Sequence, residues 1–245
     1  MTDSHDLIQD LAHDVLGSLN SIETDGDKLY HCIDNWDPET IRRIALVIGA
    51  TSRYAARRVR NYTWLSYGLH GPAELRGTAT HIGQSVLACA KDAEAIADMD
   101  GVQVHVDMPS FAALPAISID DHLFRWALAN LLENAVKYAK ELTKVSVAAS
   151  QAKSEVRILV TDYGIPLHEQ ETELIFRPGY RSQESRMRHT SGAGIGLSVA
   201  RDIIRLHGGD ILAAPSTYDD DREAHKVVFT IVLPLDEGGA ADADQ

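Results

Sequence analysis

The chain has 245 residues and carries 23 lysines and arginines against 36 aspartates and glutamates, for a formal net charge of −13 at pH 7. A surface this acidic repels phosphate backbones, so nucleic acid is not an expected partner. Apolar residues make up 44% of the chain, enough to bury a core in one large domain or in a medium domain joined to a small one.

The first residues lack the basic and then apolar pattern of a signal peptide, and the longest apolar run, near IALVIGA, is too short to cross a bilayer. We therefore expect no membrane insertion and a cytoplasmic location. The two cysteines, Cys32 and Cys89, have no metal-binding spacing and are expected to be free thiols in a reducing compartment.

Two long amphipathic helices are predicted at the N-terminal end of the chain. One face of the first carries Leu7, Ile8, Leu11, Val15, Leu19 and Ile22 at helical spacing. The second begins at the cap and first turn Asp37-Pro38-Glu39 and runs to about Tyr67. Its apolar stripe carries Ile41, Ile44, Ile48, Ala55, Val59 and Tyr62. Such a hairpin cannot cover both stripes by itself, so we expect either a homodimeric four-helix bundle or packing against the rest of its own chain.

A mixed α/β region is predicted from residue 73. Helices are expected at 75–97, after Ser118-Ile119-Asp120, and behind the glycines at 192–196; a polar loop is expected at 164–191. Strands are expected at 102–106, 144–149, 155–161, 209–213 and 226–233. The late strands come in hairpin-like pairs, which favours an α/β sandwich with a mixed sheet over a doubly wound parallel sheet. The expected fold class is therefore α+β, with a helical hairpin at 1–70, the sandwich at 71–235 and a disordered tail at 236–245.

Three glycines, Gly192, Gly194 and Gly196, precede a predicted helix. Glycines at this spacing let the backbone approach a ligand closely, and the exposed N–H groups and the positive helix end favour a phosphate. The third glycine comes too early for a dinucleotide fingerprint, and the Gly-Lys-Ser/Thr of a P-loop is absent. The alternative is a device for packing the helix against the loop.

Two further motifs carry polar groups that suit a nucleotide. Asn130, Asn134 and Lys137 share one face of a predicted helix, where an amide oxygen suits Mg²⁺ and the lysine suits a phosphate; the alternative is a solvated polar face. Asp162 ends a predicted strand just before Gly164, where a buried carboxylate can accept a hydrogen bond from an exocyclic amine such as that of adenine. The alternative there is a plain turn aspartate.

In order and spacing, these three motifs resemble the nucleotide-binding domain of the histidine kinase, gyrase and Hsp90 superfamily, and the form NLLENAVKY at 130–138 is typical of its histidine kinase branch. The resemblance extends over about 75–235. It implies that the chain binds ATP and Mg²⁺, with Asn134 as the metal ligand and Asp162 as the reader of the adenine amine. It implies a phosphate side lined by Asn130, Lys137 and Tyr138, a base approach permitted by Gly164, and a phosphate cradle formed by Gly192, Gly194, Gly196 and Leu197.

The segment Ile175–Arg181 resembles the aromatic box of the same family, with Arg181 at the position expected to reach the terminal phosphate. Two departures from the family pattern lie nearby. Pro166 replaces a glycine of the usual Asp-x-Gly-x-Gly and predicts a stiffer first hinge of the lid, because proline fixes φ and removes an N–H. Gly179 replaces the second aromatic residue of the box.

The N-terminal segment that begins His13-Asp14 resembles the phosphoacceptor box of histidine kinases, with Ser18 where proline is usual. The resemblance implies that His13 takes the γ-phosphoryl group and that Asp14 orients the ring or accepts its proton. His13 lies on the polar side of the helix, and Gly17, one turn later, has no side chain to shield it. The alternative is an ordinary surface histidine. Gly17 also stands where the family has a Thr or Asn that helps to dephosphorylate the regulator, which predicts weak or absent phosphatase activity.

Three hypotheses follow for the function. The first is a cytoplasmic, homodimeric histidine kinase that phosphorylates its own His13 from ATP and passes the phosphoryl group to an aspartate of a response regulator, with input from a partner sensory protein, from the hairpin itself or from a segment outside this chain. The second is a catalytically weak dimeric scaffold that holds ATP or ADP as a switch. The third, an anti-sigma type serine kinase, shares the ATP domain but does not need the His13 hairpin.

Overall fold

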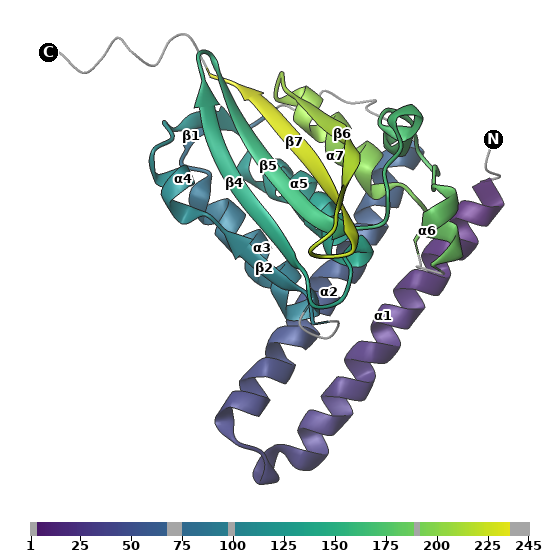
Figure 1. Ribbon diagram of the computed structural model, residues 1–245. Helices are drawn as coiled ribbons and strands as arrows, with labels where there is room; N and C mark the ends of the chain where they lie inside the picture. The colour runs from purple at the N-terminus through teal and green to yellow at the C-terminus, as the bar shows by residue number, and fades with distance from the viewer. Residues whose placement is uncertain (1–3, 68–74, 98–100, 189–191, 236–245) are drawn as a thin grey trace, which may run out of the picture.

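In the computed structural model, which describes residues 4–67, 75–97, 101–188 and 192–235, a helical hairpin leads into an α/β sandwich (Figure 1). The α+β class and the mixed sheet predicted from the sequence are confirmed. The predicted tail at 236–245 lies outside the described residues. Within the described part of the chain, no helix combines the length and the apolar character needed to span a membrane.

The hairpin consists of α1 (Ser4–Cys32), the short η1 (Ile33–Asn35) and α2 (Pro38–Tyr67). The side chain of Asp37 caps α2, because its Oδ1 accepts hydrogen bonds from the backbone N–H groups of Glu39 and Thr40, both at 3.0 Å. The predicted start and end of this helix are therefore confirmed. The lower half of the hairpin extends away from the sandwich, while the C-terminal half of α2 runs along it (Figure 1).

The apolar stripes of the hairpin are only partly buried. Leu19 is 50% exposed and Val59 45% exposed, so the single chain leaves these two members of the stripes uncovered. On α1 the buried residues are instead Asp14 and Ser18. Ser18 donates to the carbonyl oxygen of Asp14 at 3.0 Å, and the Asp14 carboxylate pairs with Arg58, so both polar groups are satisfied when buried. The side chains of residues 4–8 and 10 lie outside the described part.

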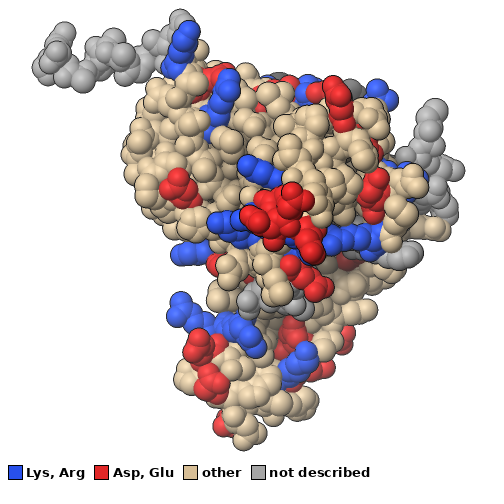
Figure 2. Space-filling model, in the orientation of Figure 1, with Lys and Arg blue, Asp and Glu red and all other residues tan. Residues whose placement is uncertain are grey.

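Five strands form the main sheet, in the order β2-β4-β5-β7-β6. They are β2 (Gln103–Val106), β4 (Lys144–Ala152), β5 (Glu155–Gly164), β6 (Asp210–Asp219) and β7 (Ala224–Pro234). β2 runs parallel to β4, and the other neighbours are antiparallel. Three helices, α3 (Gly83–Ala97), α5 (Asp121–Tyr138) and α7 (Gly196–Leu206), form a layer on one face of the sheet (Figure 1). Acidic and basic side chains are interspersed over the face drawn in Figure 2, on the sandwich and on the hairpin alike.

Three expectations about individual elements are corrected. The helix predicted at 75–97 begins only at Gly83, because Thr78–Thr80 forms β1, which pairs antiparallel with β3 (Ile117–Ile119). A Thr-Ala-Thr segment suits a strand once a partner is present, and that partner lies far along the sequence. The short α4 (Met108–Ala112) was not predicted. The polar loop expected at 164–191 contains η3 (Glu169–Glu171), η4 (Leu174–Phe176) and α6 (Gln183–Met187).

Helix α5 anchors the site to the core. Asp120 caps it by accepting a hydrogen bond from the backbone N–H of Leu123 at 3.1 Å. Its inward face is fully buried at Leu128, Leu131, Leu132 and Ala135. This packing fixes the rotation of the helix, and the opposite face, with the two asparagines and the lysine, is held toward the site described next.

Candidate nucleotide site

A cavity of about 140 Å³ lies where α5, the end of β5 and the glycine turn meet. It brings together most of the predicted nucleotide-binding residues, which are Asn130, Asn134, Lys137, Tyr138, Asp162, Arg181, Gly192, Gly194, Gly196 and Leu197. Asp14 of α1 also lines it. His13 and Gly164 are not among its lining residues within the described part of the chain. Residues that are far apart in the sequence thus converge on one concave surface.

Asp162 supplies a buried acceptor to this cavity. The residue is 2% exposed, and burial raises the pKa of its carboxyl from 3.8 to about 8. Val227 and Phe229, which lie on the neighbouring strand β7, line the same cavity with apolar surface. A carboxyl held among apolar groups is stabilised by a hydrogen-bond donor, and the exocyclic amine of an adenine is such a donor.

The outward face of α5 is not a solvated polar face. Asn130 is 3% exposed, so the alternative of a solvated polar face is wrong for this residue. Lys137 is half-buried; burial lowers the pKa of its ammonium group, which lies 4.9 Å from the centre of the Tyr138 ring. A desolvated cation beside a cavity favours an anionic ligand.

The glycine turn forms the other wall. Gly194 has φ of +69°, and a Cβ there would lie 2.6 Å from the carbonyl oxygen of Tyr180, so only glycine fits. The N–H of Gly179 donates to the carbonyl oxygen of Gly194 at 3.0 Å, which braces the turn against the aromatic-box segment. α7 begins at Gly196, and its positive N-terminal end therefore lies at the cavity, where it favours a phosphate.

Close packing of the backbone requires a glycine at position 164. A Cβ at this position would lie 1.9 Å from the carbonyl oxygen of Tyr138. The glycine lets β5 pass directly against the C-terminal end of α5, where an isolated bridge joins Ala139 and Gly164. Its contribution to the cavity is thus to hold Asp162 and Tyr138 close together.

The donors present fit a magnesium ion that arrives with a triphosphate. Asn134 lines the cavity and offers one neutral carboxamide oxygen. Mg²⁺ prefers oxygen ligands and is usually held by one or two protein groups, with phosphate oxygens and waters completing its shell. Asn134 is the residue that would hold it here.

The comparisons with known proteins agree with this geometry. Residues 119–237 match the family described as histidine kinase-, DNA gyrase B-, and HSP90-like ATPase. The sensor histidine kinase MtrB of Mycobacterium bovis is 26% identical over 229 residues, which cover 94% of this chain and 39% of MtrB.

Residues 119–237 thus carry an ATPase domain of this kind, and the chain as a whole is similar to sensor histidine kinases.

Two solved structures share the fold of this chain. Full-length ShkA in complex with AMPPNP has a TM-score of 0.60 at 18% identity and matches 93% of this chain and 46% of that one. The histidine kinase ThkA in complex with the response regulator protein TrrA has a TM-score of 0.56 at 20% identity and matches 94% of this chain and 61% of that one. The chain spans about a third to a half of the length of the curated relatives it matches, from 33% of a SasA to 53% of a SenX3.

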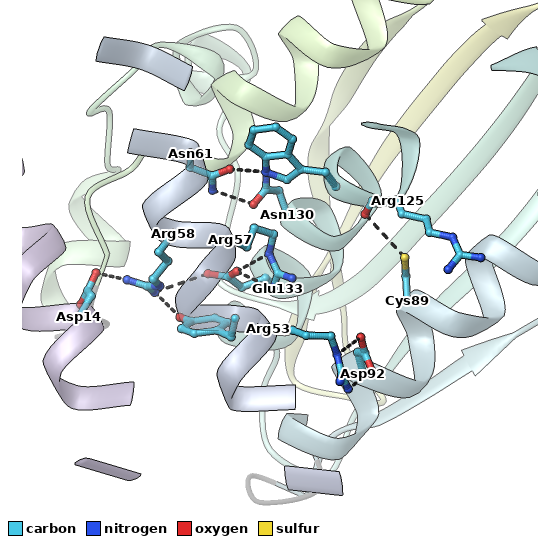
Figure 3. Close-up of polar contacts among 12 residues, drawn as sticks. Asp14, Arg53, Arg57, Arg58, Asn61, Cys89, Asp92, Arg125, Asn130 and Glu133 are labelled. Carbon is cyan, nitrogen blue, oxygen red and sulfur yellow. Dashed lines mark hydrogen bonds and ion pairs between the residues drawn. The ribbon is translucent and has the colours of Figure 1, made fainter. Parts of the chain in front are cut away.

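Residues of the hairpin also line the nucleotide cavity, and sequence reasoning missed them. Asn61 of α2 is 3% exposed and forms a reciprocal amide pair with Asn130: its Nδ2 donates to Oδ1 of Asn130 at 2.8 Å, and Nδ2 of Asn130 donates back at 3.1 Å (Figure 3). Trp126 Nε1 also donates to Asn61, at 2.6 Å. Arg58 lines the same cavity. The volume is below the roughly 300–1,000 Å³ typical of small-molecule pockets, and these two α2 side chains reach into it.

A sequence signal for this contact existed. Arg53, Arg57 and Asn61 recur every four residues on α2 and therefore share one face. Arg53 pairs with Asp92 of α3, with Nε 2.7 Å from Oδ2 (Figure 3). Arg57 pairs with Glu133 of α5, with Nη2 3.0 Å from Oε2. Periodic polar residues on one helix face mark a docking stripe, but the sequence alone does not name the partner.

A second groove of about 480 Å³ adjoins the nucleotide cavity and contains His13 and Gly17 in its lining. The His13 side chain is 86% exposed, and its Nδ1 lies 3.9 Å from Oδ1 of Asp14. A Cβ built on Gly17 would meet no atom within 4 Å, so this side of the helix is open. Four residues line both hollows: Asp14, Arg58, Glu133 and Lys137.

Proposed function

We propose that the chain is an ATP-dependent protein-histidine kinase that transfers the γ-phosphoryl group of ATP to His13 and from there to an aspartate of a response regulator. The observation that carries the proposal is the shared wall between the nucleotide cavity and the groove of an exposed histidine. A phosphoryl donor in one hollow and an acceptor in the other would share the side chains that line both, and side chains can move.

Some residues of the two hollows bind the nucleotide, and others take part in the transfer. Asp162 accepts the exocyclic amine of the adenine, and Lys137 together with the N–H groups of the glycine turn binds the phosphates. Magnesium, when bound, neutralises charge on the β- and γ-phosphates. Asp14 lies on the Nδ1 side of His13, which leaves Nε2 as the nucleophile.

In the transfer, Nε2 forms a bond to the γ-phosphorus while the bond from that phosphorus to the bridging oxygen breaks, and ADP leaves. Asp14 stabilises the proton on Nδ1, so the ring can carry the positive charge that develops. The protein contributes position and charge rather than covalent chemistry of its own.

We infer a division into a phosphotransfer hairpin at 1–70 and an ATP-binding domain at 71–235. The hairpin also serves as the dimer interface in this proposal. Apolar side chains on both helices support it, since Leu16 is 58%, Leu19 50%, Leu46 53% and Val59 45% exposed. A second hairpin would cover them. Light scattering on the purified chain should give a dimer, and Leu19→Glu should shift it to monomer; a monomeric wild type would contradict this part.

The partner expected downstream is a receiver domain. The structural neighbour ThkA was solved with the response regulator protein TrrA, and the exposed position of His13 offers a second protein access to the phosphorylated ring. A receiver protein that gains label from the phosphorylated chain in seconds to minutes would support this step.

Incubation with γ-labelled ATP and Mg²⁺ tests the proposal. The wild type should acquire acid-labile label, and His13→Ala and Asn134→Ala should each lose it, the first while still binding nucleotide. Nucleotide binding without any label on the wild type would favour the dimeric switch instead. Alkali-labile label on an added protein would favour a serine kinase.

A further inference from the structure

Arg58 lies at the centre of the wall that separates the two hollows. The residue is in the C-terminal half of α2 and is 8% exposed. Its guanidinium group bonds the carboxylate of Asp14 and the hydroxyl of Tyr54, and one Nη lies 3.5 Å from Oε1 of Glu133 (Figure 3). A buried arginine is thus held by groups from both hairpin helices and from α5.

The same guanidinium lies beside the glycine turn. A Cβ built on Gly192 would lie 2.9 Å from Nζ of Lys137 and 3.6 Å from Nη2 of Arg58. Two cations therefore converge on the backbone that is expected to cradle the phosphates. Like charges that are close together and desolvated repel each other, and an anion between them relieves the repulsion.

One donor of Arg58 is still available. Its Nε is buried and makes no hydrogen bond within the described residues. Arg57, the neighbouring arginine, differs in both respects: it does not line the nucleotide cavity, and its guanidinium bonds Glu133 through Nε and Nη2, at 3.3 and 3.0 Å. The two residues thus provide a matched pair for an experiment.

We propose that Arg58 is a catalytic residue supplied by the hairpin, which binds the γ-phosphate of ATP together with Lys137 and in doing so releases Asp14. This inference rests on the proposed function. In the structure, the carboxylate of Asp14 is paired with the guanidinium group of Arg58. A γ-phosphate carries more negative charge than a carboxylate and presents a fork of oxygens that suits arginine, so it displaces Asp14. The freed Asp14 then serves His13, its neighbour in the chain.

The exchange couples occupancy of the nucleotide cavity to activation of the nucleophile. ADP lacks the γ-phosphate and leaves the pair between Asp14 and Arg58 in place. Only the triphosphate therefore prepares His13, and the charge that neutralises the transferring group comes from the same helical hairpin that carries the acceptor.

Calorimetric titration with ATP and with ADP, both with Mg²⁺, tests the exchange. All variants are made in the His13→Ala background, so that transfer does not consume ATP. Arg58→Gln should weaken ATP binding by roughly tenfold to a hundredfold, the range for one charge-assisted hydrogen bond, and should leave ADP binding within about threefold. The control, Arg57→Gln, should change the affinities for the two nucleotides by the same factor.

Asp14→Asn gives the reverse signal. With no carboxylate to displace, Arg58 should bind the γ-phosphate more tightly, so the ratio of ATP to ADP affinity should rise several-fold, and this gain should vanish when Arg58→Gln is added. If Arg58→Gln fails to unfold cooperatively, Arg58→Lys and Asp14→Asn carry the test, since both keep a cation at position 58.

Equal effects of Arg58→Gln on ATP and ADP, or an unchanged ratio in Asp14→Asn, would overturn the inference and leave the proposed kinase intact if the wild type still labels His13. If Arg58→Gln weakens the binding of ATP but not of ADP, and the wild type acquires no label from γ-labelled ATP, the contact between Arg58 and the γ-phosphate is upheld and the transfer step is rejected.

Discussion

Replacing Asp162 with asparagine isolates the cost of burying an acid in the nucleotide cavity. Burial raises the pKa of this carboxyl from 3.8 to about 8. In the unfolded chain the group ionises near its ordinary value, so between about pH 4 and pH 8 folding must return a proton to it. The folded wild type therefore loses stability as pH rises through this window, and the loss is complete above the folded pKa.

The size of the effect follows from linkage. Within the window, each pH unit lowers the free energy of unfolding of the wild type by about 1.4 kcal/mol relative to a chain without the acid. The asparagine variant has no such group. Between pH 5.5 and 7.5, the stability of Asp162→Asn minus that of the wild type should therefore grow by about 3 kcal/mol.

Urea unfolding curves at four or more pH values measure this difference. Asp221→Asn, in the exposed turn between β6 and β7, is the control for the loss of one carboxylate outside the cavity. A flat difference for Asp162→Asn would refute proton uptake on folding and, with it, the picture of an unpaired acid in the cavity. An increase at low pH instead of high pH would show that the carboxylate is stabilised in the folded state.

The same substitution has a second consequence for ligand binding. A hydrogen bond from the adenine amine favours the ionised carboxylate, so nucleotide binding releases a proton, and the affinity of the wild type for ADP should rise with pH up to about 8. Asp162→Asn should bind ADP roughly tenfold to a hundredfold more weakly, as expected for loss of a charge-assisted hydrogen bond. It should also lose the pH dependence in calorimetric titrations.

Three further outcomes are expected. Gly164→Ala places a Cβ 1.9 Å from the carbonyl oxygen of Tyr138 and should lower the free energy of unfolding by about 1–3 kcal/mol, measured by denaturant titration; an unchanged stability would mean that the strand can shift. In Gly17→Ala, the added Cβ meets no atom within 4 Å. This substitution should raise the free energy of unfolding by about 0.5–1 kcal/mol, and a decrease would mean that the helix is distorted there. Cys89 is buried, which raises the pKa of its thiol to about 11, so iodoacetamide should modify Cys32 first; equal rates, read by mass spectrometry, would contradict the burial.

Helix α2 contacts the sandwich and α1 through several side chains of its C-terminal half. Asn61 is hydrogen-bonded to the amide of Asn130, and Arg58 is paired with Asp14. Trp64 packs edge-on against Trp126, with ring centres 5.2 Å apart. Hairpin side chains thus lie where the family resemblance expects phosphates. In the proposed function, binding of ATP rearranges these contacts, and this links occupancy of the nucleotide cavity to His13.

The sequence by itself determined the features that depend on short-range chemistry. The Asp37 cap and the stop after Tyr67 predict the bounds of α2, and the spacing of Leu128, Leu131 and Leu132 predicts which face of α5 is buried. The glycine turn and Asp162 were found because their residue types and spacing are specific. In each case the residues that decide the structure are neighbours in the chain, so local patterns are sufficient.

Only the tertiary structure decided which of the remaining polar groups meet. Arg58 and Asp14 are 44 residues apart, and Asn61 and Asn130 are 69 apart, so neither pair leaves a local pattern. The strand at Thr78–Thr80 likewise forms because Ile117–Ile119 pairs with it. Leu19 and Val59 match the helical period of the covered residues but stay exposed, because periodicity predicts that a face is apolar and only packing shows what covers it.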